Sequence, residues 1–226
     1  MEEMQKAETR DLFEEGEALF SLLGRLIYGV PDRKLINEVA VGRLYEDVPL
    51  LSATDELNEA ASLLAEWADQ WLAEGENEAF SNLRAEYTRM FVGKQRVVAP
   101  LWESVYFNRD RMVFQQETFQ VRAMYQRHGL QIDKLSHEPD DHLSYELLFL
   151  AALFRECGDF ASQGDWDAVT KTWADARSFA VCHPLAWVPQ WNEMVQQRSR
   201  SPFYRGYALL VLAALREVEQ LDLSLA

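Results

Sequence analysis

The segment over residues 143–154 restricts the fold of this chain more than any other. On a helix, its apolar residues cover most sides rather than one stripe. They are Leu143, Leu147, Leu148, Phe149, Leu150, Leu153 and Phe154. A helix that is apolar all round has to be surrounded by other elements. The segment therefore predicts a central helix inside a bundle.

The rest of the chain supplies helices to surround it. Apolar residues recur at helical spacing, and no segment alternates convincingly with a period of two. Besides a first long helix that ends before Gly29, we expect helices over residues 32–46, 55–74, 76–92, 115–128, 139–157, 165–181, 184–197 and 202–222. Pro139, Pro184 and Pro202 lie near three of these starts, where the missing N–H of proline costs nothing. The prediction is an all-α chain: one compact bundle of roughly nine helices, a single domain over residues 1–226, with a connector and hinge at 130–138.

The segment over residues 93–110 breaks the helical period although it is strongly apolar. It contains Pro100, Leu101, Trp102 and Tyr106. An irregular segment of this kind either packs against helices or presents an apolar surface to a partner. We expect it to contribute to a binding site.

The charge of the chain argues against several classes of partner. It carries 37 acidic and 22 basic residues, a formal net charge of −15. An acidic surface repels nucleic-acid phosphates and anionic membranes, and it attracts basic ligands. Residues 94–129 differ from the rest, with six basic and three acidic residues. We expect no nucleic-acid partner.

Nothing in the sequence predicts insertion into a membrane or export. The longest uninterrupted apolar run covers the nine residues 207–215, whereas a spanning helix needs about 20. The first 17 residues carry seven acids, unlike the basic start of a secretory leader. Cys157 and Cys182 form neither a disulfide framework nor a CxxC motif. We expect a cytoplasmic protein with reduced thiols.

The densest polar cluster is Glu138-Pro-Asp-Asp-His142, at the start of the central helix. One interpretation is purely structural: acids in the first turn oppose the positive end of the helix dipole. The other is a site for a cationic group, bound by charge-assisted hydrogen bonds. Glu146 lies four residues after His142 and can pair with it if the histidine is protonated.

The same cluster contains the residue types of a metal site. Its two histidines, at positions 137 and 142, lack the spacing of the helical zinc motif, and Pro139 lies between them. The sequence also has no Gly-x-Ser-x-Gly motif and no phosphate-binding glycine loop. We expect no metal, no cofactor and no enzymatic activity, and keep a metal-dependent hydrolase as a minor hypothesis.

A second cluster is aromatic. Tyr87, Met90 and Phe91 share a helix face at i, i+3 and i+4, which is typical of a core stripe. Trp102 and Tyr106 in the neighbouring irregular segment extend it. Aromatic and methionine side chains make an adaptable surface for an apolar peptide. Beside the acidic cluster, such a groove would suit a peptide with arginines next to a hydrophobic stretch.

These motifs, in order, resemble the TorD/DmsD family of redox-enzyme maturation chaperones, most strongly over residues 80–160. They are Glu86-Tyr-x-x-Met-Phe-Val-Gly93, Pro100-x-Trp-Glu-Ser-Val-Tyr106, Glu138-Pro-Asp-Asp-His142 and Pro202-Phe-Tyr-Arg205. The resemblance implies an all-helical cytoplasmic chaperone, a monomer or a helix-exchanged dimer. It implies binding of the twin-arginine signal peptide and apo catalytic subunit of a molybdopterin oxidoreductase of the DMSO/TMAO-reductase type, for cofactor insertion and proofreading before export.

The resemblance also implies the peptide-binding residues. By motif position they are Tyr87, Met90, Phe91, Pro100, Trp102, Tyr106, Glu138, Asp140, Asp141 and His142. The chain departs from some members at two positions, with Tyr87 in place of tryptophan and Leu101 in place of proline. Both departures change the pocket that a peptide would meet. The alternative function is a maturation adaptor for a cytoplasmic metalloenzyme without a twin-arginine leader.

Overall fold

The computed structural model describes residues 2–46, 48–74, 76–93, 97–132, 138–221 and 223. Within these residues the chain forms ten α-helices and one π-helical turn, and no strand. They are α1 (Glu2–Ile27), α2 (Arg33–Gly42), α3 (Asp55–Glu74), α4 (Glu76–Tyr87), η1 (Thr88–Val92), α5 (Ser104–Phe107), α6 (Gln116–Arg127), α7 (Leu143–Gln163), α8 (Trp166–Cys182), α9 (Pro184–Arg198) and α10 (Pro202–Gln220). The predicted all-α bundle is confirmed, and nine of these α-helices are longer than a single turn.

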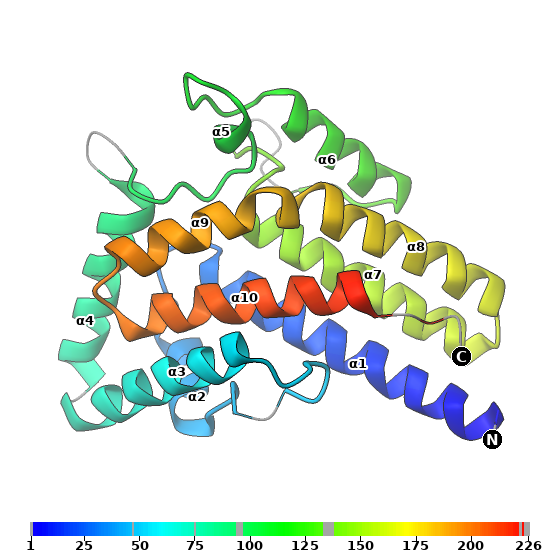
Figure 1. Ribbon diagram of the computed structural model, residues 1–226, viewed down its shortest axis with the longest axis horizontal. Coiled ribbons are helices and arrows are strands. Elements are labelled where there is room, and N and C mark those ends of the chain that lie inside the picture. The colour runs from blue at the N-terminus through cyan, green and yellow to red at the C-terminus, as the bar shows by residue number, and fades with distance from the viewer. Residues whose placement is uncertain are drawn as a thin grey trace.

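Helix α7 lies at the centre, as its apolar sequence predicts. It packs between α1 and α8 (Figure 1). Leu143, Leu147, Leu150, Leu153 and Phe154 are completely buried. Helix α10 forms a second layer against α3 and α9, while α5 and α6 lie along one edge of the molecule (Figure 1).

Two glycines let α1 approach α7 closely. A Cβ atom at Gly16 would lie 2.1 Å from the ring of Phe154, and one at Gly24 would lie 2.7 Å from Leu148. The Ser144 hydroxyl then reaches across and donates to the Gly24 carbonyl at 2.8 Å. The close approach of α1 to α7 thus depends on the absence of side chains at two positions of α1.

The start of α7 differs from the prediction. The helix begins at Leu143 rather than at residue 139, because Asp140 and Asp141 form a turn. His142 caps the helix instead, and its Nδ1 accepts the Ser144 N–H at 3.1 Å. Pro184 and Pro202 do occupy the first positions of α9 and α10.

Three other predicted boundaries also change. The helix predicted over 76–92 leaves the α conformation at Thr88 and ends with the Gly93 N–H donating to the Thr88 carbonyl, five residues back. The helix predicted over 32–46 ends at Gly42, since Arg43 adopts a left-handed conformation with φ of 46°. Helix α7 continues past residue 157 to Gln163 and ends at Gly164, with φ of 77°.

Two further expectations concern the connector and the membrane. Residues 133–137 of the predicted hinge over 130–138 lie outside the described residues. Among the residues that are described, no helix is both long and apolar enough to cross a bilayer.

Substitution Gly16→Ala tests the close α1–α7 contact. The new methyl group overlaps the Phe154 ring, so one of the two helices has to shift. We expect the free energy of unfolding to fall by about 1–3 kcal/mol in urea titrations. The matched control is Gly158→Ala in α7, where a Cβ meets only Phe13 at an ordinary 3.6 Å. The control should be neutral or up to about 1 kcal/mol more stable, since alanine favours the helix. Equal stability of the two variants would contradict the account.

Candidate functional site

Two segments far apart in sequence pair to organise the candidate site. The Leu143 N–H donates to the Leu101 carbonyl at 2.8 Å, and the Glu103 N–H donates to the Asp141 carbonyl at 3.0 Å. We call this antiparallel pairing of residues 101–103 with 141–143 the clasp. It brings the rings of Trp102 and His142 edge to face, with centroids 5.5 Å apart.

A cavity of about 310 Å³ opens in front of the clasp. Its walls come from the end of α1, from the junction of α4 and η1, from the clasp and from the first turn of α7. The residues that line it are Tyr28, Gly29, Val30, Tyr87, Phe91, Val92, Leu101, Trp102, Glu138, His142 and Tyr145. We call it the clasp cavity.

Five of the ten predicted site residues line the clasp cavity together. They are Tyr87, Phe91, Trp102, Glu138 and His142. Two further lining residues, Tyr28 and Tyr145, are not among those predicted from sequence; their ring centroids lie 5.7 Å apart, edge to face. Tyr145 lies three residues after His142 on α7, so its helical spacing was a usable signal. Tyr28 had no local signal, because only the tertiary fold brings the end of α1 here.

Glu138 is the one acidic residue among the described residues of the lining, and no lysine or arginine accompanies it. Trp102 Nε1 donates to Glu138 Oε1 at 3.0 Å, which fixes the carboxylate against the indole. Burial, with the added charge of Glu138, raises the pKa of Tyr87 to about 12. The Tyr87 hydroxyl therefore stays protonated beside a fixed negative charge.

His142 contributes no positive charge to the cavity. Burial lowers its pKa to about 3. Because Nδ1 accepts the Ser144 N–H, the neutral ring carries its proton on Nε2. The sequence allowed a pair between His142 and Glu146 only if the histidine is protonated, and this condition is not met at neutral pH. Glu146 instead accepts a hydrogen bond from Trp187 Nε1 at 3.2 Å.

Asp140 and Asp141 lie behind the cavity wall and do not line it. Both are completely buried. Asp141 accepts from the Ser104 N–H and from the Thr118 hydroxyl, each at 2.7 Å. Asp140 pairs with Arg122 at 2.6 Å. The two aspartates therefore fasten α6 and the start of α5 to the clasp.

The remaining predicted residues build the wall behind Trp102. Met90 is buried, and its carbonyl accepts the N–H groups of Val98 and Ala99. The Tyr106 hydroxyl donates to the Pro100 carbonyl at 2.8 Å. These three predicted residues, Met90, Pro100 and Tyr106, support the cavity without lining it.

A buried ionisable layer lies beneath the clasp. Glu103 faces His183, with 3.0 Å between Oε2 and Nδ1. Glu146 is fully buried, and its Oε1 meets no donor within the described part of the chain. Burial, followed by the neighbouring charges of Glu103 and Asp141, raises the pKa of Glu146 well above its ordinary value. Glu146 therefore holds its proton where an exposed glutamate loses it.

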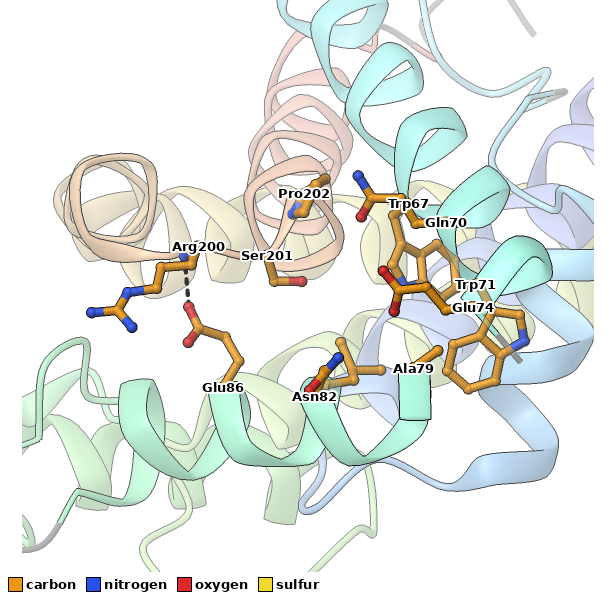
Figure 2. Close-up of a pocket in the computed structure, with 11 residues that line it drawn as sticks. Trp67, Gln70, Trp71, Glu74, Ala79, Asn82, Glu86, Arg200, Ser201 and Pro202 are labelled. Carbon is orange, nitrogen blue, oxygen red and sulfur yellow. Dashed lines mark hydrogen bonds between the residues drawn. The ribbon is translucent and has the colours of Figure 1, made fainter. Parts of the chain in front are cut away.

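A second cavity, of about 190 Å³, lies between α3, α4 and the turn before α10 (Figure 2). None of the ten predicted residues lines it. Two carboxylates, Glu74 and Glu86, line it. Glu86 is engaged by Arg89, by the Ser199 hydroxyl at 3.0 Å and by the Arg200 N–H at 2.6 Å. Burial alone would raise the pKa of Glu86, but these hydrogen bonds outweigh it and lower the pKa. Glu86 thus anchors the last turn of α4, which holds Tyr87 at the clasp cavity.

The metal hypothesis gains no support from the described residues. They contain no group of three or more histidine, cysteine, aspartate or glutamate side chains that could hold an ion. Residue 137, the first histidine of the cluster, lies outside them.

Comparisons with known proteins place this chain beside a set of chaperones. The family model described as nitrate reductase delta subunit matches residues 51–193. A Tat proofreading chaperone DmsD from Salmonella typhi is 23% identical over 206 residues, covering 87% of this chain and 85% of the relative. A chaperone protein TorD from Aliivibrio fischeri is 23% identical over 166 residues, covering 74% and 75%. A probable Tat proofreading chaperone DmsD from Haemophilus influenzae is 26% identical over 136 residues, 60% of each chain.

Removing the buried acid Glu146 should change how stability depends on pH. An unfolded glutamate ionises near pH 4.5, whereas folded Glu146 ionises well above that value. The free energy of unfolding should therefore fall as pH rises above about 4.5 toward the raised pKa of folded Glu146. Glu146→Gln cannot ionise and still accepts from Trp187, so urea unfolding should show a smaller fall. The control Glu193→Gln, at an exposed position of α9, should keep the wild-type slope. A wild-type slope in Glu146→Gln would contradict this assignment.

Asp141→Ala tests whether this aspartate is structural. The substitution leaves the Ser104 N–H and the Thr118 hydroxyl buried without their acceptor. We expect a loss of about 2–5 kcal/mol in chemical unfolding, because each unsatisfied buried group costs about 1–3 kcal/mol. The exposed Asp110→Ala variant should stay within about 0.5 kcal/mol of wild type. Wild-type stability of Asp141→Ala would show that the clasp does not depend on this carboxylate.

Proposed function

Because the chain belongs to the TorD/DmsD family, described by its family model as nitrate reductase delta subunit, we propose that it is a chaperone of redox enzymes rather than an enzyme. The relatives with similarity over most of this chain are named as chaperones. We propose further that it acts in the cytoplasm. There it would bind the twin-arginine signal peptide and the apo form of a molybdenum-cofactor oxidoreductase, of the DMSO/TMAO-reductase type, before export.

One observation carries the peptide-binding part of this proposal. The clasp cavity presents a single fixed carboxylate, Glu138, in a wall that is otherwise mainly aromatic and aliphatic. A twin-arginine leader has the complementary order, with basic residues followed by an apolar stretch. The cavity thus offers a carboxylate for the arginines and apolar contact for the residues beside them.

The chemistry of each wall gives it a role. The Glu138 carboxylate accepts two parallel N–H groups of an arginine, which a lysine cannot supply. The Trp102 indole beside it offers an aromatic face to the same guanidinium. The Tyr87 hydroxyl and His142 Nε2–H are donors for carbonyl oxygens of the peptide. Phe91 and Val30 provide apolar contact.

The other predicted residues act on the peptide through these five. Asp140 and Asp141 hold the clasp from behind, and Met90, Pro100 and Tyr106 support Trp102 and its neighbours. The net charge of −15 adds long-range attraction for a basic leader and raises the association rate more than the final affinity. Apolar burial, at about 25 cal/mol per Å², supplies most of the affinity.

The alternative is an adaptor for a cytoplasmic metalloenzyme that has no twin-arginine leader. The same cavity would then bind an internal segment of that client. In either case the family likeness suggests a monomer or a helix-exchanged dimer. The two functions differ in whether paired arginines matter to binding, and that difference is measurable.

Calorimetric titration with a synthetic twin-arginine leader tests the proposal. We expect micromolar or tighter binding that weakens when both arginines are replaced by lysine. Glu138→Gln should weaken binding of the leader about tenfold, roughly 1.4 kcal/mol, and remove most of the difference between the two peptides. Added salt should weaken wild-type binding modestly.

The controls separate this outcome from its alternatives. Glu193→Gln removes an equal charge from an exposed position and should leave the affinity unchanged. Equal binding of the arginine and lysine peptides would favour the adaptor. Unaltered affinity in Glu138→Gln would remove the clasp cavity from the binding site.

A further inference from the structure

A second apolar groove, of about 290 Å³, adjoins the clasp cavity. The two share Tyr28 and Tyr145 as a common boundary. The residues that line the groove are Tyr28, Tyr125, Leu130, Gln131, Ile132, Tyr145, Leu148, Phe149 and Ala152. None of the peptide-binding residues that the sequence predicts is among them. We call it the α7 groove.

Both hollows lie along one side of α7. His142, Tyr145, Phe149 and Ala152 follow one another at i, i+3, i+7 and i+10, which is a single stripe of a helix. At 1.5 Å per residue the stripe is about 15 Å long. Along this stripe Tyr145 and Ala152 are partly exposed, whereas His142 and Phe149 are buried.

The α7 groove differs from the clasp cavity in carrying no charged side chain within its described lining. Among the described residues that line it, no side chain carries a formal charge, although 26% of the whole chain is charged. The clasp cavity carries Glu138. Along the stripe, the surface thus passes from a carboxylate end to an uncharged apolar end.

The floor of the α7 groove is fixed rather than adaptable. The Tyr125 hydroxyl donates to the Asp140 carbonyl at 3.1 Å, and its ring packs on Phe149 with centroids 4.6 Å apart. Phe149 packs in turn on Phe179 of α8, at 4.7 Å. An apolar ligand would therefore enter a preformed groove.

We infer that the α7 groove binds the apolar stretch that follows the arginines of the leader, while the clasp cavity holds the arginines. This inference rests on the proposed function and adds a second subsite to it. The peptide passes over the Tyr28–Tyr145 pair. A stripe of about 15 Å accommodates about five residues of extended chain, or about ten of a helix.

Two synthetic peptides test the inference by calorimetry. Both begin with the same twin-arginine segment; one continues with leucine and alanine, the other with serine and glycine. We expect wild-type protein to bind the apolar peptide about tenfold more tightly. Ala152→Gln fills the groove with a neutral polar side chain, and there the preference should fall to about twofold or less. Binding of the serine–glycine peptide should stay at its wild-type value.

A control variant and a second groove variant distinguish loss of the subsite from a folding defect. Ala123→Gln makes the same change at an exposed position of α6 outside the groove and should keep the full preference. Tyr28→Ala, at a side chain that is 47% exposed just beyond α1, should also reduce the preference. Thermal melts of all variants measure their stability independently.

The results separate the subsite from the function it serves. Equal wild-type affinity for the two peptides, or an unchanged preference in a folded Ala152→Gln, would overturn the α7 groove as a subsite while leaving leader binding intact. Failure of both peptides to bind wild-type protein would overturn the proposed function and this inference together.

Discussion

The buried carboxylate of Asp141 is the interaction on which the candidate site depends. One oxygen accepts from the backbone of Ser104, the other from Thr118 on α6, and the Asp141 carbonyl closes the clasp with Glu103. A single residue therefore joins three segments that are distant in sequence. Trp102 and His142 face one another because this junction sets the register between them. The side of the clasp that lines the cavity is thus shaped by a group that does not itself line it.

Each buried acid near the candidate site is stabilised in a different way. Asp140 has a guanidinium partner, Asp141 has two donors, and Glu103 has His183. Glu146 has one neutral donor, Trp187 Nε1, and no cationic partner; burial raises its pKa, so it keeps its proton. Unpaired buried charge is expensive, so each of these carboxyl groups is neutralised or bonded within the protein. The clasp cavity consequently receives its negative charge from Glu138 alone among the described residues of its lining.

Much of the fold was predictable from sequence because helical periodicity is a local property. The start of α7 was not, since proline and acids at 139–141 satisfy the same rules as a helix start while the actual cap is a histidine. Sequence motifs indicated ten residues for the site, of which five line the clasp cavity. Within the clasp, Leu101, Trp102 and His142 line the cavity, whereas Glu103 and Asp141 do not. That division requires knowing which segments pair, and the pairing joins residues about forty positions apart. Tyr28 required the tertiary fold for the same reason.

A protein that binds apolar peptides has to expose apolar surface without associating with itself. Here the partly exposed side of α7 is bordered by tyrosines. A tyrosine ring covers apolar surface, while its hydroxyl group can hydrogen-bond to water. A net charge of −15 adds repulsion between copies and attraction for basic peptides. The same acidity disfavours a nucleic-acid partner and, under the proposed function, attracts a basic leader to the partly exposed side of α7.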